Sequence, residues 1–297
     1  MSSMQVLGPS QSPKFTSPEA CDITSLLDLN RAIPNEKIAK NLAAWRDQYQ
    51  NNAPYPHIAL ENFFDPGLIA TLVANFPSPK FGGWRITHDA TGHFEQKFNL
   101  SSYELIPAPL RLFIDVLNSR PFLEFLEQLT GIDGLIPDPH LIGGGLHMLC
   151  RGGRLGIHID FNRHKKMQLD RRLNALVYLN PEWKREWGGS LELWNDDVSK
   201  KCREYLPLAN TLVIFSTTGK SYHGHPDPLT CPPDVYRRSI ALYYYTNGRP
   251  SEEVRADHTT VFKLRPGEQR SHSLKYDLKQ LTPPLIWQGL ARLVARQ

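Results

Sequence analysis

The stretch Gly156-Ile157-His158-Ile159-Asp160-Phe161 constrains this chain more than any other. Successive side chains of a β-strand point to opposite faces, so His158 and Asp160 share one face while the apolar residues occupy the other. Such a strand offers an imidazole nitrogen and a carboxylate oxygen to one point in space. One distant histidine would complete a 2-His-1-carboxylate set, which holds non-haem Fe(II) with open coordination positions. Taken alone, the tripeptide also fits an ordinary surface or core strand.

Two candidates for the missing histidine follow, in Ser221-Tyr222-His223-Gly224-His225-Pro226. They lie two residues apart, so either could face a metal. We favour His223, because Gly224 permits a close approach of the backbone, whereas Pro226 pushes the chain around His225 out of regular strand pairing. The alternative is that His223 is a turn residue and His225 a hydrogen-bonded surface group.

The composition bounds the class of protein. The chain has 297 residues, of which 40% are hydrophobic and 22% charged, and its net charge of +4 is too small to argue for nucleic acid by itself. The four cysteines form no CxxC pair, so neither a zinc site nor a disulfide framework is indicated. The first residues lack a secretory signal pattern, and no apolar run approaches the length of a membrane span. We therefore expect a cytoplasmic protein without a membrane partner.

The first half of the chain predicts helices that support a sheet. Residues 1–30 are rich in Ser, Pro and Gln and predict a flexible arm, because they bury too little apolar surface to offset the entropy of ordering. Residues 31–140 predict a helical and strand support region. Its expected elements are a helix N-capped by Asn35 and reaching Trp45, a strand within 55–64, a helix from Asp65-Pro66 to about Phe76, and helices over 107–117 and 121–129.

The second half has the sequence pattern of an antiparallel β sandwich or barrel, with short apolar runs broken by Gly and turn residues. Residues 141–250 are expected to form the catalytic core, and residues 251–297 an extension that packs on it through an amphipathic helix near 285–294. The expected strands are 146–150, which turns at Gly152-Gly153 into the strand that bears His158, and then 173–180, 190–194, 210–215 and 237–246.

The order of the motifs points to a family. The motifs are His158-x-Asp160, Tyr178-Leu179-Asn180, Gly188-Gly189-x-Leu191, His223 and Arg237-x-Ser239. In this order they resemble the Fe(II)- and 2-oxoglutarate-dependent dioxygenases of the prolyl 4-hydroxylase-like branch, over about residues 141–246. The resemblance implies a mainly β fold with flanking helices (α+β), a double-stranded β-helix or jelly roll. The chain departs from the family in residues 224–236, which are longer than the usual spacing.

The resemblance also assigns roles to residues. It implies three iron ligands, His158, Asp160 and His223. It implies that Arg237 binds the distal carboxylate of 2-oxoglutarate, assisted by Ser239 and Tyr178. The physics agrees, because a guanidinium presents a planar fork that suits a carboxylate bidentately. Arg237 and Ser239 share one strand face, whereas Arg238 lies on the other.

The implied reaction is hydroxylation of an unactivated C–H bond in a prolyl, peptidyl or small-molecule substrate, with release of succinate and CO2. Its cofactors would be Fe(II), 2-oxoglutarate as co-substrate, O2 and, optionally, ascorbate. Because related halogenases lack the metal-binding carboxylate, Asp160 favours hydroxylation. The basic segment 163–172 could attract an anionic substrate near the site or be a solvated loop. Three tryptophans could line a substrate groove or simply pack the core: Trp183, Trp187 and Trp194.

Two other functions stay open. One is a nucleic-acid or nucleotide demethylase of the same superfamily, although such relatives resemble one another in a second Arg six positions after the first, where this chain has Tyr243. The other is a non-catalytic metal-binding jelly-roll protein, which would have no need of a dicarboxylate clamp. We expect no nucleic-acid partner, and the sequence leaves the oligomeric state open.

Overall fold

The structure is a computed structural model, and it describes residues 32–87 and 94–268. The helices are α2 (Asn35–Asn51), α3 (Pro66–Ala74), α4 (Ala108–Leu117) and α5 (Arg120–Thr130), with 3-10 turns η2 (Tyr103–Leu105), η3 (Arg185–Trp187) and η4 (Ser251–Glu253). The strands are β1 (His57–Glu61), β2 (Arg85–Thr87), β3 (Phe94–Leu100), β4 (Ile136–Pro137), β5 (Gly145–Ile159), β6 (Arg163–His164), β7 (Leu169–Tyr178), β8 (Leu191–Trp194), β9 (Lys201–Tyr205), β10 (Thr211–Ser216), β11 (His223–His225), β12 (Arg237–Thr246) and β13 (Val261–Phe262).

The sheet curls into two layers because one long strand belongs to both. Neighbouring strands follow the order β1-β10-β7-β12-β5-β11-β8-β9, and these pairs are antiparallel. The first part of β5 pairs with β12, whereas its last residues pair with β11. The outcome is a nearly closed antiparallel barrel with flanking helices, which confirms the predicted double-stranded β-helix.

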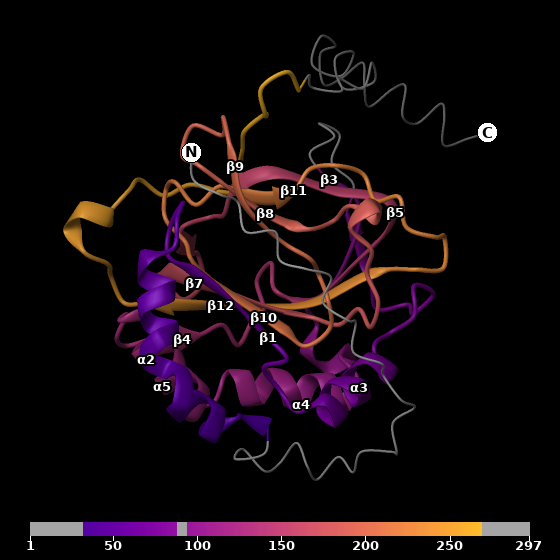
Figure 1. Cartoon of the computed structure of the whole chain (residues 1–297), viewed down its shortest axis with the longest axis horizontal. Coiled ribbons are helices and arrows are strands. Elements are labelled where there is room, and N and C mark those ends of the chain that lie inside the picture. The colour runs from indigo at the N-terminus through magenta and orange to yellow at the C-terminus, as the bar shows by residue number, and fades with distance from the viewer. Residues whose placement is uncertain (1–31, 88–93, 269–297) are drawn as a thin grey trace, which may run out of the picture.

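The helices cover the layer made by β1, β10, β7 and β12 (Figure 1). Strand β12 shows how the sequence produces this packing, since its residues alternate between the two faces. Ile240, Leu242 and Tyr244 pack in the main hydrophobic cluster together with helix residues, and the Tyr244 hydroxyl donates to the Leu117 carbonyl. The opposite face, which carries Ser239, lines a cavity between the layers. The predicted alternation along this strand is therefore confirmed.

The four predicted helices are present, although α2 continues past Trp45 to Asn51 and α3 ends at Ala74 rather than near Phe76. Pro66 lies in the first turn of α3, and the Asp65 carboxylate accepts a hydrogen bond from Leu68 N at 2.9 Å, as an N-cap should. Helix α2, in contrast, begins at Asn35 itself with Pro34 in the capping position, so the assignment of Asn35 as N-cap was wrong. The fixed φ of proline suits the entry to a helix without a side-chain acceptor.

Strand β5 also differs from the prediction, which placed a turn at Gly152-Gly153. The strand runs without interruption from Gly145 to Ile159. Gly152 adopts a positive φ and its N–H donates to the Leu229 carbonyl, and the register with β3 shifts at this point, since Lys97 is opposite Leu149 but Glu95 is opposite Arg154; the backbone therefore bulges and bends at the two glycines. A bend in one strand, rather than a hairpin, carries the chain from one layer to the other.

The tryptophans pack rather than line a groove. Trp183 and Trp194 are buried in small clusters beneath the strands, and Trp187 packs edge-on against Trp183. Of the other expectations, the N-terminal arm and the helix near 285–294 lie outside the described residues. Within the described residues, no helix is both long and apolar enough to cross a bilayer.

The end of the described chain returns to β5. After the turn η4, the short strand β13 pairs with the last residues of β5, with Val261 opposite Ile159 and Phe262 opposite His158. The Phe262 ring lies 5.3 Å from the His158 ring, between centroids. Residues beyond the predicted core therefore contact the strand that carries the candidate ligands.

Candidate metal centre

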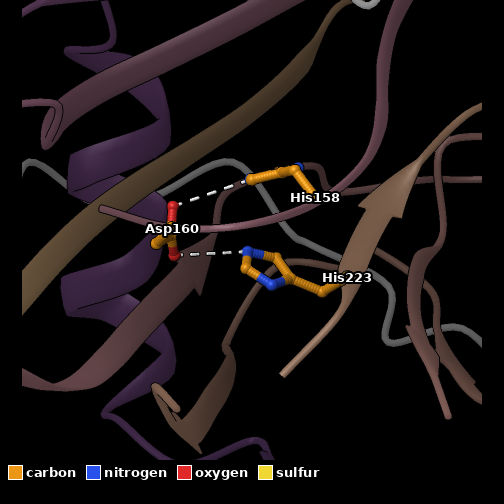
Figure 2. Close-up of side chains that lie close together, drawn as sticks. All are labelled: His158, Asp160 and His223. Atoms are coloured by element: carbon orange, nitrogen blue, oxygen red, sulfur yellow. Dashed lines mark ion pairs between the residues drawn. The ribbon is translucent and has the colours of Figure 1, made fainter. Parts of the chain in front are cut away.

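The structure brings His158, Asp160 and His223 together. Their ligand atoms all lie within 4.8 Å of one another. Asp160 faces both imidazoles (Figure 2), with Oδ1 3.6 Å from His158 Nε2 and Oδ2 3.4 Å from His223 Nε2. Two nitrogens and one oxygen at this spacing are the donor set that suits non-haem Fe(II).

Strand register explains why the two histidines meet. His223 on β11 is the direct cross-strand partner of His158 on β5, so both side chains project from the same face. The two strands approach closely at Gly224, where an added Cβ would lie 2.7 Å from the Gly156 carbonyl oxygen. Only glycine fits there, as the sequence argument expected. Asp160 follows β5 by one residue and turns back toward this pair.

The hydrogen bonds of the imidazoles suit metal binding. His158 Nδ1 donates to the Gly156 carbonyl and His223 Nδ1 donates to the Ser221 carbonyl, each at 2.9 Å. These bonds fix the tautomer that leaves each Nε2 without a proton and free to ligate. Burial, followed by the neighbouring His158, lowers the pKa of His223 to about 4, which keeps its ring neutral at physiological pH. The residues present therefore fit a divalent metal.

Asp160 is held by two side chains that the sequence argument missed. Arg171 Nη2 donates to Asp160 Oδ2 at 2.9 Å, and Asn174 Nδ2 donates to the same oxygen at 2.8 Å. Burial would raise the pKa of Asp160, but the Arg171 guanidinium and the two histidines hold it well below its usual range. Arg171 is itself buried, stacked 3.5 Å over the Tyr243 ring. Asp160 is thus presented as a carboxylate with a fixed orientation.

Arg171 lies in the basic segment 163–172, which was expected either to attract an anionic substrate near the site or to be a solvated loop. Arg171 itself does neither. It is neither solvated nor at the site mouth, because β7 has already begun and the side chain is only 1% exposed. A β-bulge explains why the sequence did not predict that Arg171 faces the cavity. Tyr244 pairs with Leu173 but Tyr245 pairs with Arg171, so Arg172 is skipped and the alternation of faces reverses.

A cavity of about 410 Å³ lies beside the three residues, between the sheet layers. Arg237 and Ser239 line it, both nearly fully buried. Arg237 Nε donates to the Gly189 carbonyl at 2.6 Å and Nη2 donates to the Tyr178 hydroxyl at 3.2 Å. These two hydrogen bonds fix the orientation of the guanidinium.

The competing residues occupy other places. His225 is buried and lines the same cavity, but it lies outside the three-residue cluster. Arg238 lies on the opposite face of β12, 5.7 Å above the Phe76 ring. Tyr243 contacts Arg171 and donates to the Gly143 carbonyl at 2.9 Å. The roles assigned to His223 and Arg237 stay predictions, but the geometry is compatible with both.

Fold and site together define a class: a double-stranded β-helix that carries a His-x-Asp…His cluster beside a cationic cavity. Residues 144–245 match the family model described as the 2OG-Fe(II) oxygenase superfamily. This match confirms the resemblance that the sequence motifs indicated.

Relatives agree with the family match. The chain is 22% identical to "Prolyl 3-hydroxylase OGFOD1" of Mus musculus over 226 residues, which are 73% of this chain and 39% of that protein. The chain therefore spans about two-fifths of the length of this relative. In fold it resembles a prolyl hydroxylase from Trichoplax adhaerens, solved with a peptide of hypoxia inducible factor. That likeness has a TM-score of 0.51 and 16% identity, and covers 73% of this chain and 95% of the other.

Proposed function

We propose that this protein is an Fe(II)- and 2-oxoglutarate-dependent dioxygenase that hydroxylates an unactivated C–H bond. The observation that carries the proposal is the cluster of His158, Asp160 and His223 at the wall of a cavity that also presents Arg237. A three-residue metal set leaves coordination positions for a chelating co-substrate. A buried guanidinium on the same wall supplies the cation that a second carboxylate needs.

Each residue has a defined part in this reaction. His158, Asp160 and His223 would hold Fe(II), which would couple the reduction of O2 to two oxidations: 2-oxoglutarate would supply two electrons on conversion to succinate and CO2, and the C–H bond that becomes hydroxylated would supply the other two. Arg171 and Asn174 orient Asp160. Arg237 binds the distal carboxylate of the co-substrate, with Ser239 beside it and Tyr178 behind it. The walls of the cavity exclude bulk water from the reacting carbon.

The substrate we propose is a prolyl residue of a peptide or protein. The names of the two relatives support this class, since one is a prolyl 3-hydroxylase and the other a prolyl hydroxylase solved with a peptide. A free small molecule is the alternative. A cytoplasmic location fits the chain's cysteine usage, and the cysteines of the described residues are free. Ascorbate would serve only to keep the iron reduced.

The experiment is anaerobic reconstitution with Fe(II) and 2-oxoglutarate, followed by exposure to O2 and measurement of succinate. Proline-containing peptides are then screened by mass spectrometry for the gain of one oxygen atom. Asp160→Ala should abolish both signals, because one of three metal ligands is lost. Asp133→Ala, which removes an exposed carboxylate after α5, is the matched control and should leave both unchanged.

Three outcomes would redirect the proposal. Metal binding without succinate would favour the non-catalytic jelly-roll protein. Oxidation of methylated nucleotides but of no peptide would favour a demethylase. Coupled turnover by Asp160→Ala would remove Asp160 from the metal set.

A further inference from the structure

Three adjacent strands place a second cation beside Arg237. On β5, Leu149 pairs with Arg237 of β12 on one side and with Lys97 of β3 on the other. Directly opposed residues of a sheet project from the same face, so these three side chains form one row. All three line the cavity described above. With strands about 4.8 Å apart, the two cations flank a gap one side chain wide.

The next row of the same strands is polar. Asn99 of β3, His147 of β5 and Ser239 of β12 are paired in register and also line the cavity. His147 Nε2 donates to the Gly143 carbonyl at 3.0 Å, and burial holds the pKa of His147 well below its usual range. Asn99, His147 and Ser239 are therefore neutral, and the buried or partly buried positive charge at this end of the cavity comes from Lys97 and Arg237, while Arg85, opposite Asn99 on β2, adds an exposed cation at the rim.

The charges around the cavity do not balance. Among the described residues that line it, Asp160 is the one carboxylate, and it already accepts from Arg171. Lys97 is partly buried, and within the described chain no carboxylate lies at ion-pair distance from it. Burial lowers the pKa of Lys97, Asp160 opposes this, and Arg171 and Arg237 lower it further; Lys97 lines the same cavity as these three residues. An anion bound in this cavity would offset the desolvation of such a cation and keep it protonated.

We propose that Lys97 is a second cation of the co-substrate site and that it pairs, together with Arg237, with the distal carboxylate of 2-oxoglutarate. The inference rests on the proposed function and adds to it a binding residue from β3, outside the matched family region of 144–245. Two of the N–H donors of Arg237 are already engaged in hydrogen bonds to the Gly189 carbonyl and the Tyr178 hydroxyl. The Lys97 ammonium, from the other side of Leu149, can donate to carboxylate oxygens of 2-oxoglutarate that Arg237 leaves without a partner.

The test measures affinity in the absence of turnover. Protein loaded with Fe(II) without oxygen is titrated with 2-oxoglutarate, and chelation is followed by the absorbance of the metal complex. Lys97→Met should weaken 2-oxoglutarate binding about tenfold or more, and Lys97→Arg should recover most of it. Metal content and thermal midpoint, measured for each variant, show that the fold is kept.

The control is Arg85→Met. Arg85 lines the same cavity from β2, one strand further out, and is exposed. This variant removes an equal charge from the rim and should change the affinity little, because solvent screens it. The second arm uses 2-oxobutyrate, which keeps the chelating end but lacks the distal carboxylate. Lys97→Met should bind it as the wild type does.

The outcomes separate the possibilities. Unchanged binding of 2-oxoglutarate by Lys97→Met overturns the inference. Equal weakening of 2-oxoglutarate binding by Arg85→Met also overturns it, and so does equal weakening of 2-oxoglutarate and 2-oxobutyrate binding by Lys97→Met. Each result would indicate a non-specific electrostatic effect of the lost positive charge rather than a contact with the distal carboxylate. If the wild type itself fails to bind 2-oxoglutarate, the proposed function fails with it.

Discussion

Replacing Arg171 by Met tests how Asp160 is kept as a buried carboxylate. The substitution preserves the apolar stem but removes the ion pair at 2.9 Å and both hydrogen bonds to Asn174 Oδ1, at 3.0 and 2.7 Å. Asp160 would then keep only Asn174 and the two imidazoles as partners. Removing one member of a buried pair costs about 3–5 kcal/mol, because the other charge is left uncompensated.

We expect the lower end of that range, about 3 kcal/mol, because the Asn174 amide still donates to Asp160. For a urea dependence of about 2 kcal/mol per molar, the unfolding midpoint of the metal-free protein should fall by about 1.5 M. Tryptophan fluorescence reports the transition, since the described tryptophans are largely packed. The metal-free form is needed because a bound cation would itself stabilise Asp160.

A double-mutant cycle with Asp160→Asn isolates the pair. In the double variant no carboxylate is left buried without its cation, so it should be at least about 2 kcal/mol more stable than the sum of the two single effects implies. Strictly additive effects would refute the reasoning. They would mean that Arg171 stabilises the fold through its stacking on Tyr243 and not through Asp160.

The other predictions concern ligand choice, co-substrate binding and pH. His223→Ala should lose iron while His225→Ala retains most of it, measured as metal content, and the reverse result would move the ligand two residues along. Arg237→Ala should weaken 2-oxoglutarate binding by roughly thirtyfold or more and Arg238→Ala by far less, since Arg238 lies on the other face of β12. Burial holds the pKa of His225 well below its usual range, so unfolding takes up a proton there. Stability of the metal-free protein should therefore fall as the pH drops from about 7.5 to 5.5, and urea titrations showing no change would contradict this.

Much of the fold could be predicted because local patterns and tertiary packing agree. The alternation along β12 separates Ser239 from Ile240 as the cavity and helix sides require. The Asp65-Pro66 pair starts α3 where capping chemistry says it should. The pairing of His223 with His158 could be predicted because Gly224, next to His223, permits the close approach of two strands.

Features that depend on long-range register could not be predicted. Strict alternation back from Asn174 places Arg172 on the cavity side, but the bulge opposite Tyr244 and Tyr245 puts Arg171 there instead. A bulge depends on the partner strand, which the local sequence does not reveal. Lys97 was missed for a related reason. Its neighbours Leu149 and Arg237 are distant in the chain, and only the pairing of β3 with β5 joins them.

The contact between β13 and β5 limits where the chain can be truncated. Without residues after 250, the last residues of β5 would lose the strand that covers their outer edge, and the ring of His158 would lose the cover of Phe262. An uncovered edge of this kind invites pairing with another chain. A shortened protein that keeps every candidate ligand should therefore self-associate and leave the candidate metal site more open to solvent, because β13 covers the edge of β5 and Phe262 covers the ring of His158.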